Sequence, residues 1–218
     1  MNMKLKRVTL FSGHYGSGKT NIAVNYALHL AEMGLPVTIA DLDIVNPYFR
    51  TKDSAEDFER AGIRLISSAY ANSNVDLPAL PAELYALTGD KSRYAVLDVG
   101  GDDRGALALG RYAPAILEEG NYESIFVANF YRPLTPNAEA ALEVMREIEV
   151  AGKIPFTAIV HNSNLGEETK AEDVLAMQGE AERLSSITGL PLLFTASDAR
   201  LADALPEAFH LRLQKKIT

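Results

Sequence analysis

The chain has 218 residues, of which 47% are hydrophobic and 23% are charged, so its length and composition predict one globular domain over residues 1–218 rather than a disordered chain. Asp and Glu number 29 against 21 Lys and Arg, and the net charge of −8 argues against general nucleic-acid binding, which needs cations to neutralise phosphates. Cysteine is absent, which excludes a disulfide, a thiolate metal site and a cysteine nucleophile in this chain.

Seven short apolar runs alternate with longer helical patterns along the chain. The runs are predicted strands over residues 7–12, 37–43, 63–67, 94–99, 124–130, 156–162 and 192–195. They are apolar on consecutive residues rather than alternate ones, which is typical of strands covered by helices on both faces. The sequence therefore predicts a single doubly wound α/β domain with a mostly parallel, seven-stranded sheet.

Helix signals separate the predicted strands. Residues 19–33 carry apolar side chains at i, i+4 spacing and end at Gly34. The pair Thr135-Pro136 predicts the start of a helix over residues 138–150, with the threonine as its cap.

Further caps and a basic tail complete the helix predictions. Capping-box patterns predict helices after Ser54 and after Thr169, the second one ending near Gly189. Asp198 is predicted to cap a helix after the last strand. The tail over residues 210–218 is mildly basic and amphipathic, and we interpret it as a solvated helix end rather than a membrane anchor.

The strongest motif, G-x-x-x-x-G-K-[ST], directly follows the first predicted strand. Its eight residues are Gly13, His14, Tyr15, Gly16, Ser17, Gly18, Lys19 and Thr20. Glycines let the backbone curl so that successive N–H groups converge on phosphate oxygens, and the N-terminus of the next helix adds positive potential. Lys19 is expected to bridge the β- and γ-phosphates and Thr20 to ligate Mg²⁺, so the motif predicts a nucleoside triphosphate site.

Carboxylates end the second and fourth predicted strands. Asp41 and Asp43 close the second strand, and Asp98 closes the fourth, three residues before Gly101. Ligands bind at the carboxyl ends of strands in open α/β sheets, where such carboxylates hold hydrated Mg²⁺ and orient a water. The Gly101 N–H is placed to sense a γ-phosphate. The alternative for each aspartate is a turn-capping role.

In this order the motifs resemble the MinD/ParA group of P-loop ATPases, in the class that also contains nitrogenase iron protein and CooC-type maturation ATPases. The resemblance runs over the whole chain and implies a protein that dimerises around ATP. It implies that Lys19 holds the phosphates and that Thr20 and Asp98 hold Mg²⁺. It further implies that Asp41 acts through Mg²⁺-bound waters and that Asp43 positions the hydrolytic water.

The chain departs from that group at one position. The group's loop reads K-G-G-x-G-K-[ST], and its first lysine reaches the partner's phosphates across the dimer. Here His14 takes that place, and Tyr15 replaces a glycine. A protonated histidine beside a triphosphate supplies part of that charge, although its side chain is shorter than lysine. The alternative is that His14 is a loop residue without a catalytic role.

The predicted base site is at the end of the sixth strand. Relatives present an asparagine to the base here, and Asn162 has an amide that both donates and accepts, which suits adenine. Guanine-specific proteins normally carry an aspartate three residues later, where this chain has Leu165. We therefore expect ATP, with Mg²⁺, rather than GTP. The alternative role for Asn162 is that of a turn former.

The leading hypothesis is a slow Mg²⁺-dependent ATPase that acts as a nucleotide switch for an unidentified protein client. One alternative is a small-molecule kinase or ligase resembling dethiobiotin synthetase or the cobyrinic acid amide synthases, with residues 72–85 lining the acceptor pocket. Another is a nucleotide-binding adaptor that does not hydrolyse its nucleotide. The presence of Asp43 and Asp98 argues against an adaptor, because these carboxylates are expected to serve hydrolysis. No apolar run reaches the length of a membrane span, and the chain starts like a strand rather than a signal peptide, so we expect a cytoplasmic protein.

Overall fold

The computed structural model describes residues 5–42, 51–67, 87, 89–101, 105 and 109–213. Two sequence predictions lie outside these residues. They are Asp43, predicted to position the hydrolytic water, and residues 72–85, the predicted acceptor lining of the kinase alternative.

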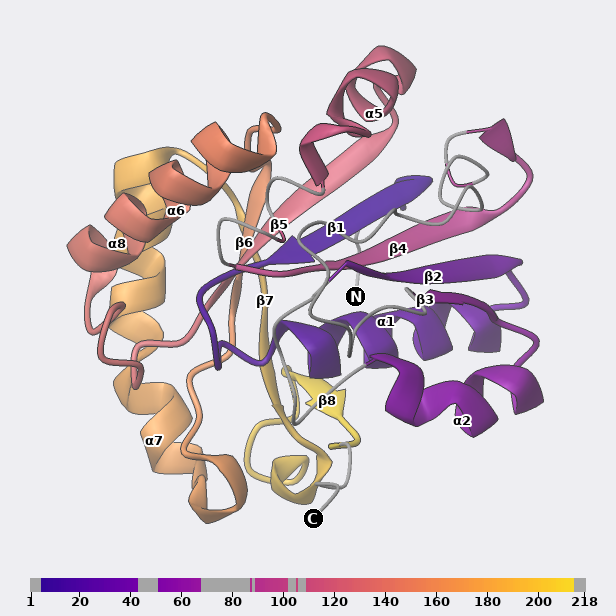
Figure 1. Ribbon diagram of the computed structural model, residues 1–218. Coiled ribbons are helices and arrows are strands. Elements are labelled where there is room, and N and C mark those ends of the chain that lie inside the picture. Colours follow the sequence, from indigo (N-terminus) through magenta and orange to yellow (C-terminus); the bar gives the residue numbers. More distant parts are fainter. Residues whose placement is uncertain are drawn as a thin grey trace, which may run out of the picture.

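Within the described residues, eight strands form one sheet in the order β3-β2-β4-β1-β5-β6-β7-β8, and all neighbouring strands run parallel (Figure 1). The strands are β1 (Val8–Ser12), β2 (Val37–Leu42), β3 (Arg64–Ser67), β4 (Tyr94–Val99), β5 (Tyr122–Ala128), β6 (Ala158–His161), β7 (Leu192–Asp198) and β8 (Phe209–Leu211). The prediction of a parallel α/β sheet is confirmed, with one strand more than the seven expected.

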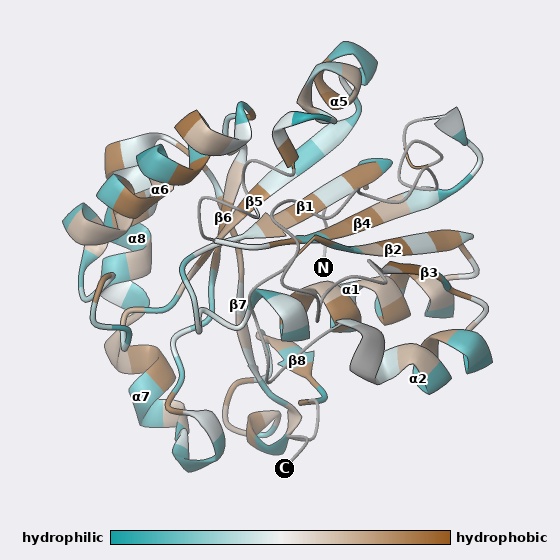
Figure 2. Cartoon of the chain, in the orientation of Figure 1, coloured by the Kyte–Doolittle hydropathy of each residue, from teal (hydrophilic) through white to brown (hydrophobic). Residues whose placement is uncertain are grey.

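Helices cover both faces of this sheet. They are α1 (Lys19–Glu32), α2 (Ala55–Arg60), α5 (Ala113–Glu119), α6 (Ala138–Gly152), α7 (Ala171–Ala176) and α8 (Gln178–Thr188), with short 3-10 turns at Thr51–Ser54, Gly166–Glu168 and Ala199–Leu201. Figure 1 shows α1 and α2 below the sheet, α5 above it, and α6 and α8 at its left. In Figure 2 the central strands are largely brown, while the outer helices carry both brown and teal. This is the doubly wound arrangement that the sequence predicts.

Side chains of the strands alternate between the two faces. Phe11 packs in the cluster that α1 covers, while Leu10 packs in the cluster that includes α5. On β5, Ile125 joins the α1 cluster and Phe126 joins the cluster of α6 and α8. Because both faces are buried, the strands need apolar side chains at consecutive positions, which is the pattern in the sequence.

The predicted helix over the tail is wrong at its start, because Phe209–Leu211 form strand β8. Ala196 pairs with Phe209 and Asp198 with Leu211, parallel to β7. The Phe209 ring lies 5.1 Å from that of Phe194 and 6.0 Å from that of His29. Pairing with the open edge of β7, together with this ring packing, favours a strand over a helix. The rest of the predicted tail, residues 214–218, lies outside the described part of the chain.

Two helix starts differ from the sequence prediction. Helix α6 is capped by Asn137, whose side chain accepts from Ala140 N at 2.9 Å, and the predicted cap Thr135 instead donates to the Asn129 carbonyl at 2.7 Å. The predicted helix after Thr169 is split into α7 and α8. The first difference arises from a contact that competes with the local capping pattern.

The predicted cap at Asp198 is confirmed. Its carboxylate accepts from Arg200 N at 2.9 Å and opens the 3-10 turn Ala199–Leu201. Helix α2 follows Ser54, as the capping pattern predicts. None of the helices in the described ranges is long and apolar enough to cross a membrane.

Candidate functional site

The glycine-rich loop connects the carboxyl end of β1 to the first turn of α1. Gly16 and Gly18 have φ angles of +76° and +88°, a left-handed conformation that glycine adopts without strain. Ser17 N donates to the His14 carbonyl at 2.9 Å and closes the turn between them. Lys19, the first residue of α1, is buried. The curled backbone and the buried lysine agree with the predicted phosphate-binding loop, which we call the P-loop (residues 13–20).

Close backbone contacts hold the P-loop against the neighbouring strand ends. A Cβ atom on Gly13 would lie 2.5 Å from the carbonyl oxygen of Val127 in β5. A Cβ atom on Gly101, just after β4, would lie only 1.8 Å from the Gly13 carbonyl oxygen. The glycine at position 101 is therefore required sterically, a role that the sequence analysis did not foresee. Its proposed contact with a γ-phosphate remains a prediction.

Two aspartates lie next to each other beside the P-loop. Asp41 of β2 pairs in register with Asp98 of β4. Ala40 and Leu97, which precede them, point into the core on the α5 side, so both aspartates face the α1 side, where the P-loop ends. Asp98 is fully buried and accepts a hydrogen bond from Thr51 Oγ1 at 3.0 Å. Because two adjacent carboxylates repel each other, this arrangement favours a bound cation.

Buried hydroxyls supply the rest of a metal and phosphate site. Thr20 Oγ1 and Ser17 Oγ are buried and have no hydrogen-bond partner among the residues that the structure describes. Ser12 Oγ, at the end of β1, is likewise buried without a hydrogen-bond partner among the described residues. Unsatisfied buried hydroxyls are rare, and phosphate oxygens or a metal ion would satisfy them. Thr20 and Asp98 therefore fit the hard oxygen ligands of Mg²⁺, which would neutralise charge on the β- and γ-phosphates when bound.

Side chains from two other loops bind the carbonyls at the tip of the P-loop. Asn162 Nδ2, directly after β6, donates to the Ser17 carbonyl at 2.7 Å. Arg132 Nε, in the loop after β5, donates to the Gly16 carbonyl at 2.8 Å. Asn162 thus supports the P-loop in this structure, and its contact with a base stays a prediction. Arg132 was missed by the sequence analysis, although its place after a strand next to β1 could have marked it.

His14 points into its own loop. Its Nδ1 donates to the Tyr15 carbonyl at 2.9 Å, and its ring is half-buried, while Tyr15 is exposed. This local contact fits the interpretation of His14 as a loop residue. It does not test whether a protonated His14 acts on a triphosphate, which stays a prediction.

A second histidine is buried at the end of β6, next to Asn162 in the sequence. His161, the last residue of β6, donates from Nδ1 to Gln178 Oε1 at 3.2 Å, and Thr195 Oγ1 donates to the same oxygen at 3.0 Å. Burial lowers the pKa of His161 to about 4 from its ordinary 6.5, and the bond to Gln178 only partly opposes the change. His161 is therefore neutral at pH 7.

This buried histidine predicts a loss of stability in mild acid. Between pH 6.5 and 4 the unfolded chain binds a proton at His161 that the folded protein does not. The stability that depends on a neutral His161 is therefore fully present above pH 6.5 and is lost as the pH falls toward 4. We expect His161 to account for about 2 kcal/mol of the stability lost between pH 7 and pH 5. Urea unfolding at both pH values measures it. His161→Gln should remove this part of the pH dependence, whereas the half-buried His210→Gln should keep it; equal pH dependence in the two variants would contradict the assignment.

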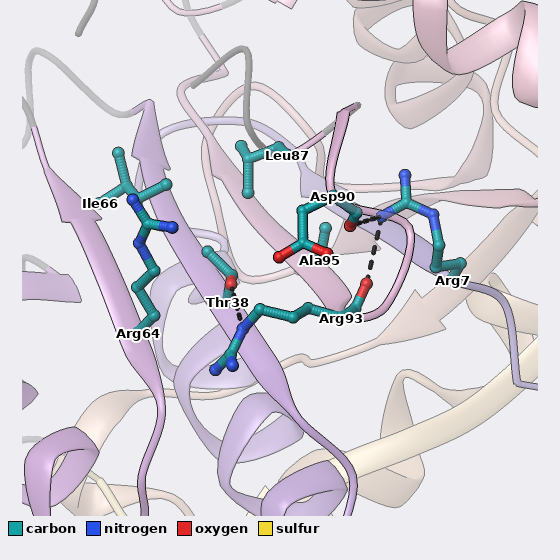
Figure 3. A pocket seen from close by; sticks show the side chains of 8 residues that line it. All are labelled: Arg7, Thr38, Arg64, Ile66, Leu87, Asp90, Arg93 and Ala95. Carbon is teal, nitrogen blue, oxygen red and sulfur yellow. Dashed lines mark hydrogen bonds between the residues drawn. The ribbon is translucent and has the colours of Figure 1, made fainter. Parts of the chain in front are cut away.

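A pocket at the opposite end of the strands is separate from this site (Figure 3). Its lining residues are Arg7, Thr38, Arg64, Ile66, Leu87, Asp90, Arg93 and Ala95. Arg7 forms an ion pair with Glu119, and Arg93 donates to Thr38 Oγ1 at 3.0 Å and to the Val37 carbonyl at 2.7 Å. These arginines are thus engaged in holding the amino ends of the strands together.

Comparisons with known proteins show the fold. No protein-family model and no curated protein matches the chain. Among solved structures, it is similar to the cell division protein FtsY from Thermotoga maritima (18% identity, TM-score 0.60, 89% of this chain and 63% of that one). FtsY from Elizabethkingia anophelis in complex with GDP matches at 16% identity (TM-score 0.54, 91% and 59%). A nucleotide-binding protein from Archaeoglobus fulgidus in complex with ADP matches at 15% identity (TM-score 0.51, 90% and 85%).

These neighbours share the P-loop NTPase fold with this chain, an α/β domain around a parallel sheet. The chain spans less than two thirds of the two FtsY chains. At identities below one fifth, the likeness establishes the architecture, and the chemistry has to be argued from the residues of the site.

Proposed function

We propose that this protein is a Mg²⁺-dependent ATPase that acts as a nucleotide switch for a protein partner, as in the MinD/ParA group. The observation that carries the proposal is the convergence of the P-loop with Asp41 and Asp98 at the carboxyl ends of β1, β2 and β4. The buried hydroxyls of Ser17 and Thr20 add oxygen ligands to that convergence.

The choice of ATP rests on the chain's own residues. Leu165 occupies the position at which guanine-specific proteins normally carry an aspartate, and it has no acceptor for the guanine N–H groups. Solved structures with this fold hold either purine, since one FtsY neighbour contains GDP and the Archaeoglobus fulgidus neighbour contains ADP. Titration of ATP and GTP in parallel separates the two, and a preference for GTP would overturn this part of the proposal.

Removal of the P-loop lysine tests nucleotide binding directly. Lys19→Ala should weaken ATP binding by about tenfold to a hundredfold, because it removes charge-assisted hydrogen bonds to phosphate. Isothermal titration with ATP and Mg²⁺, together with phosphate release, measures both binding and turnover. Lys91→Ala is the matched control, since Lys91 is exposed in the turn before β4, at the other end of the strands. Unchanged ATP affinity in Lys19→Ala would contradict the P-loop assignment.

The switch role predicts a change of assembly with the nucleotide. We expect solution mass to shift from monomer to dimer with ATP or a slowly hydrolysed analogue, but not with ADP. This result would support a MinD/ParA-like mechanism despite the histidine at position 14. A constant mass, with phosphate transferred to a metabolite rather than to water, would instead favour a small-molecule kinase.

A further inference from the structure

Arg132 lies against the tip of the P-loop, although it is more than a hundred residues away in sequence. Its Nε donates to the Gly16 carbonyl at 2.8 Å, and its Nη2 makes a longer contact of 3.5 Å with the Asn164 carbonyl. A Cβ atom on Gly16 would lie 3.4 Å from Arg132 Nε, which places the guanidinium directly over this glycine. The side chain is half-buried. Arg132 therefore bridges the P-loop and the loop after β6.

The charge of Arg132 is not balanced by a carboxylate within the described residues. Buried or surface partners neutralise other arginines, as in the pairs Arg7–Glu119, Arg183–Glu139 and Arg200–Asp198. At Arg132, partial burial lowers the pKa through desolvation, and no acidic side chain opposes the effect. A desolvated cation held by neutral carbonyls alone is costly, and an anion at this place would offset the cost.

The loop that carries Arg132 is firmly held by side-chain contacts. Asn129 Oδ1 accepts from Tyr131 N at 3.1 Å and from Asn164 N at 3.4 Å. Phe130 N donates to Ser163 Oγ at 3.0 Å. Tyr131 Oη donates to the Asp173 carbonyl at 3.0 Å. Arg132 is thus positioned before any ligand binds, which reduces the entropy cost of using it in binding.

We propose that Arg132 binds the phosphate tail of the nucleotide in cis, as a second cation of the site beside Lys19; this inference rests on the proposed function. Arginine presents five N–H donors in a planar fork, and only Nε and Nη2 donate within the described residues. The remaining donors suit two phosphate oxygens. In the MinD/ParA group a lysine of the partner supplies this cation, and His14 occupies the position of that lysine here. Under this proposal Arg132 of the same chain supplies the cation instead.

The test separates charge from hydrogen bonding at position 132. Arg132→Gln keeps an N–H donor for the Gly16 carbonyl but removes the charge. Binding of tripolyphosphate, which has no base or sugar, should weaken about tenfold or more, and its dependence on salt concentration should become shallower. Arg132→Lys restores the charge without the fork and should recover part of the affinity. Arg146→Gln, on the exposed side of α6, is the matched control and should bind as the wild type does.

A comparison with Asn162→Ala identifies a purely positioning role. That variant removes the other hydrogen bond to the P-loop tip without removing charge, so tripolyphosphate affinity should fall while the salt dependence stays unchanged. Wild-type affinity in Arg132→Gln, or a loss with unchanged salt dependence, would overturn the proposal for Arg132 alone, provided that Lys19→Ala weakens tripolyphosphate binding. If the wild type binds neither tripolyphosphate nor nucleotide, the proposed function fails as well. Thermal unfolding of each variant confirms that it is folded.

Discussion

Gly101→Ala should abolish nucleotide binding and lower the free energy of unfolding by about 3 kcal/mol, the upper end of the cost of overpacking a core. The added Cβ would lie 1.8 Å from the Gly13 carbonyl oxygen, 2.6 Å from the Gly13 carbonyl carbon and 3.2 Å from the His14 Cα. All three are backbone atoms, so no side-chain rotation relieves the contact. Either the P-loop or the end of β4 must move, and both carry predicted phosphate and metal ligands. Urea unfolding and isothermal titration with ATP measure the two effects.

Gly179→Ala is the matched control for this substitution. Gly179 lies in the first turn of α8, and a Cβ atom there would meet nothing within 4 Å. Because alanine favours helix more than glycine does, we expect the stability to stay level or rise by up to about 1 kcal/mol, with unchanged nucleotide binding. Wild-type ATP affinity in Gly101→Ala would show that the contact between β4 and the P-loop is not needed for binding.

Glu119→Ala should destabilise the protein by about 3 to 5 kcal/mol, because it leaves a buried guanidinium without its counter-charge. The Arg7 and Glu119 side chains are only 8% and 9% exposed, and Arg7 Nε and Nη2 donate to the two carboxylate oxygens. The remaining donor, Nη1, binds the Arg93 carbonyl at 3.1 Å. The pair closes the amino end of β1, away from the P-loop. The folded fraction should therefore keep its ATP affinity.

The ion pair Arg183–Glu139 provides the comparison. Its side chains are 59% and 54% exposed, and solvent screens the interaction. Glu139→Ala should cost less than about 1 kcal/mol in the same urea unfolding experiment. Equal losses in the two variants would mean that burial does not set the strength of the Arg7–Glu119 pair.

The strands and the P-loop were predictable because their signals are local. The run of consecutive apolar residues predicted β4 with the bounds that the structure shows, Tyr94–Val99. The glycine pattern predicted the loop and the start of α1 at Lys19. The rule that ligands gather at the carboxyl ends of strands placed Asp41 and Asp98 together before their register was known.

What the sequence did not reveal depends on distant contacts. Strand β8 is three residues long and is favoured by the free edge of β7. Thr51 reaches Asp98 across 47 residues, and Arg132 reaches Gly16 across 116. No local pattern marks such residues, because their roles come from chain segments brought together by the sheet. The cap of α6 shows the same effect, because the Thr135 hydroxyl, predicted as the cap, donates to the Asn129 carbonyl instead.

The order of the strands has a consequence for how the chain folds during synthesis. Val8 at the start of β1 pairs with Ala95 on one side and with Tyr122 on the other. At about 5 to 20 residues per second, a ribosome needs roughly 5 to 25 s to proceed from the first of these strands to the last. A strand from the middle of the sheet is thus synthesised first and must wait for both of its neighbours, while α1 is the first helix that can cover it. Slow folding and a need for protection of the nascent chain are the expected result of such long-range pairing.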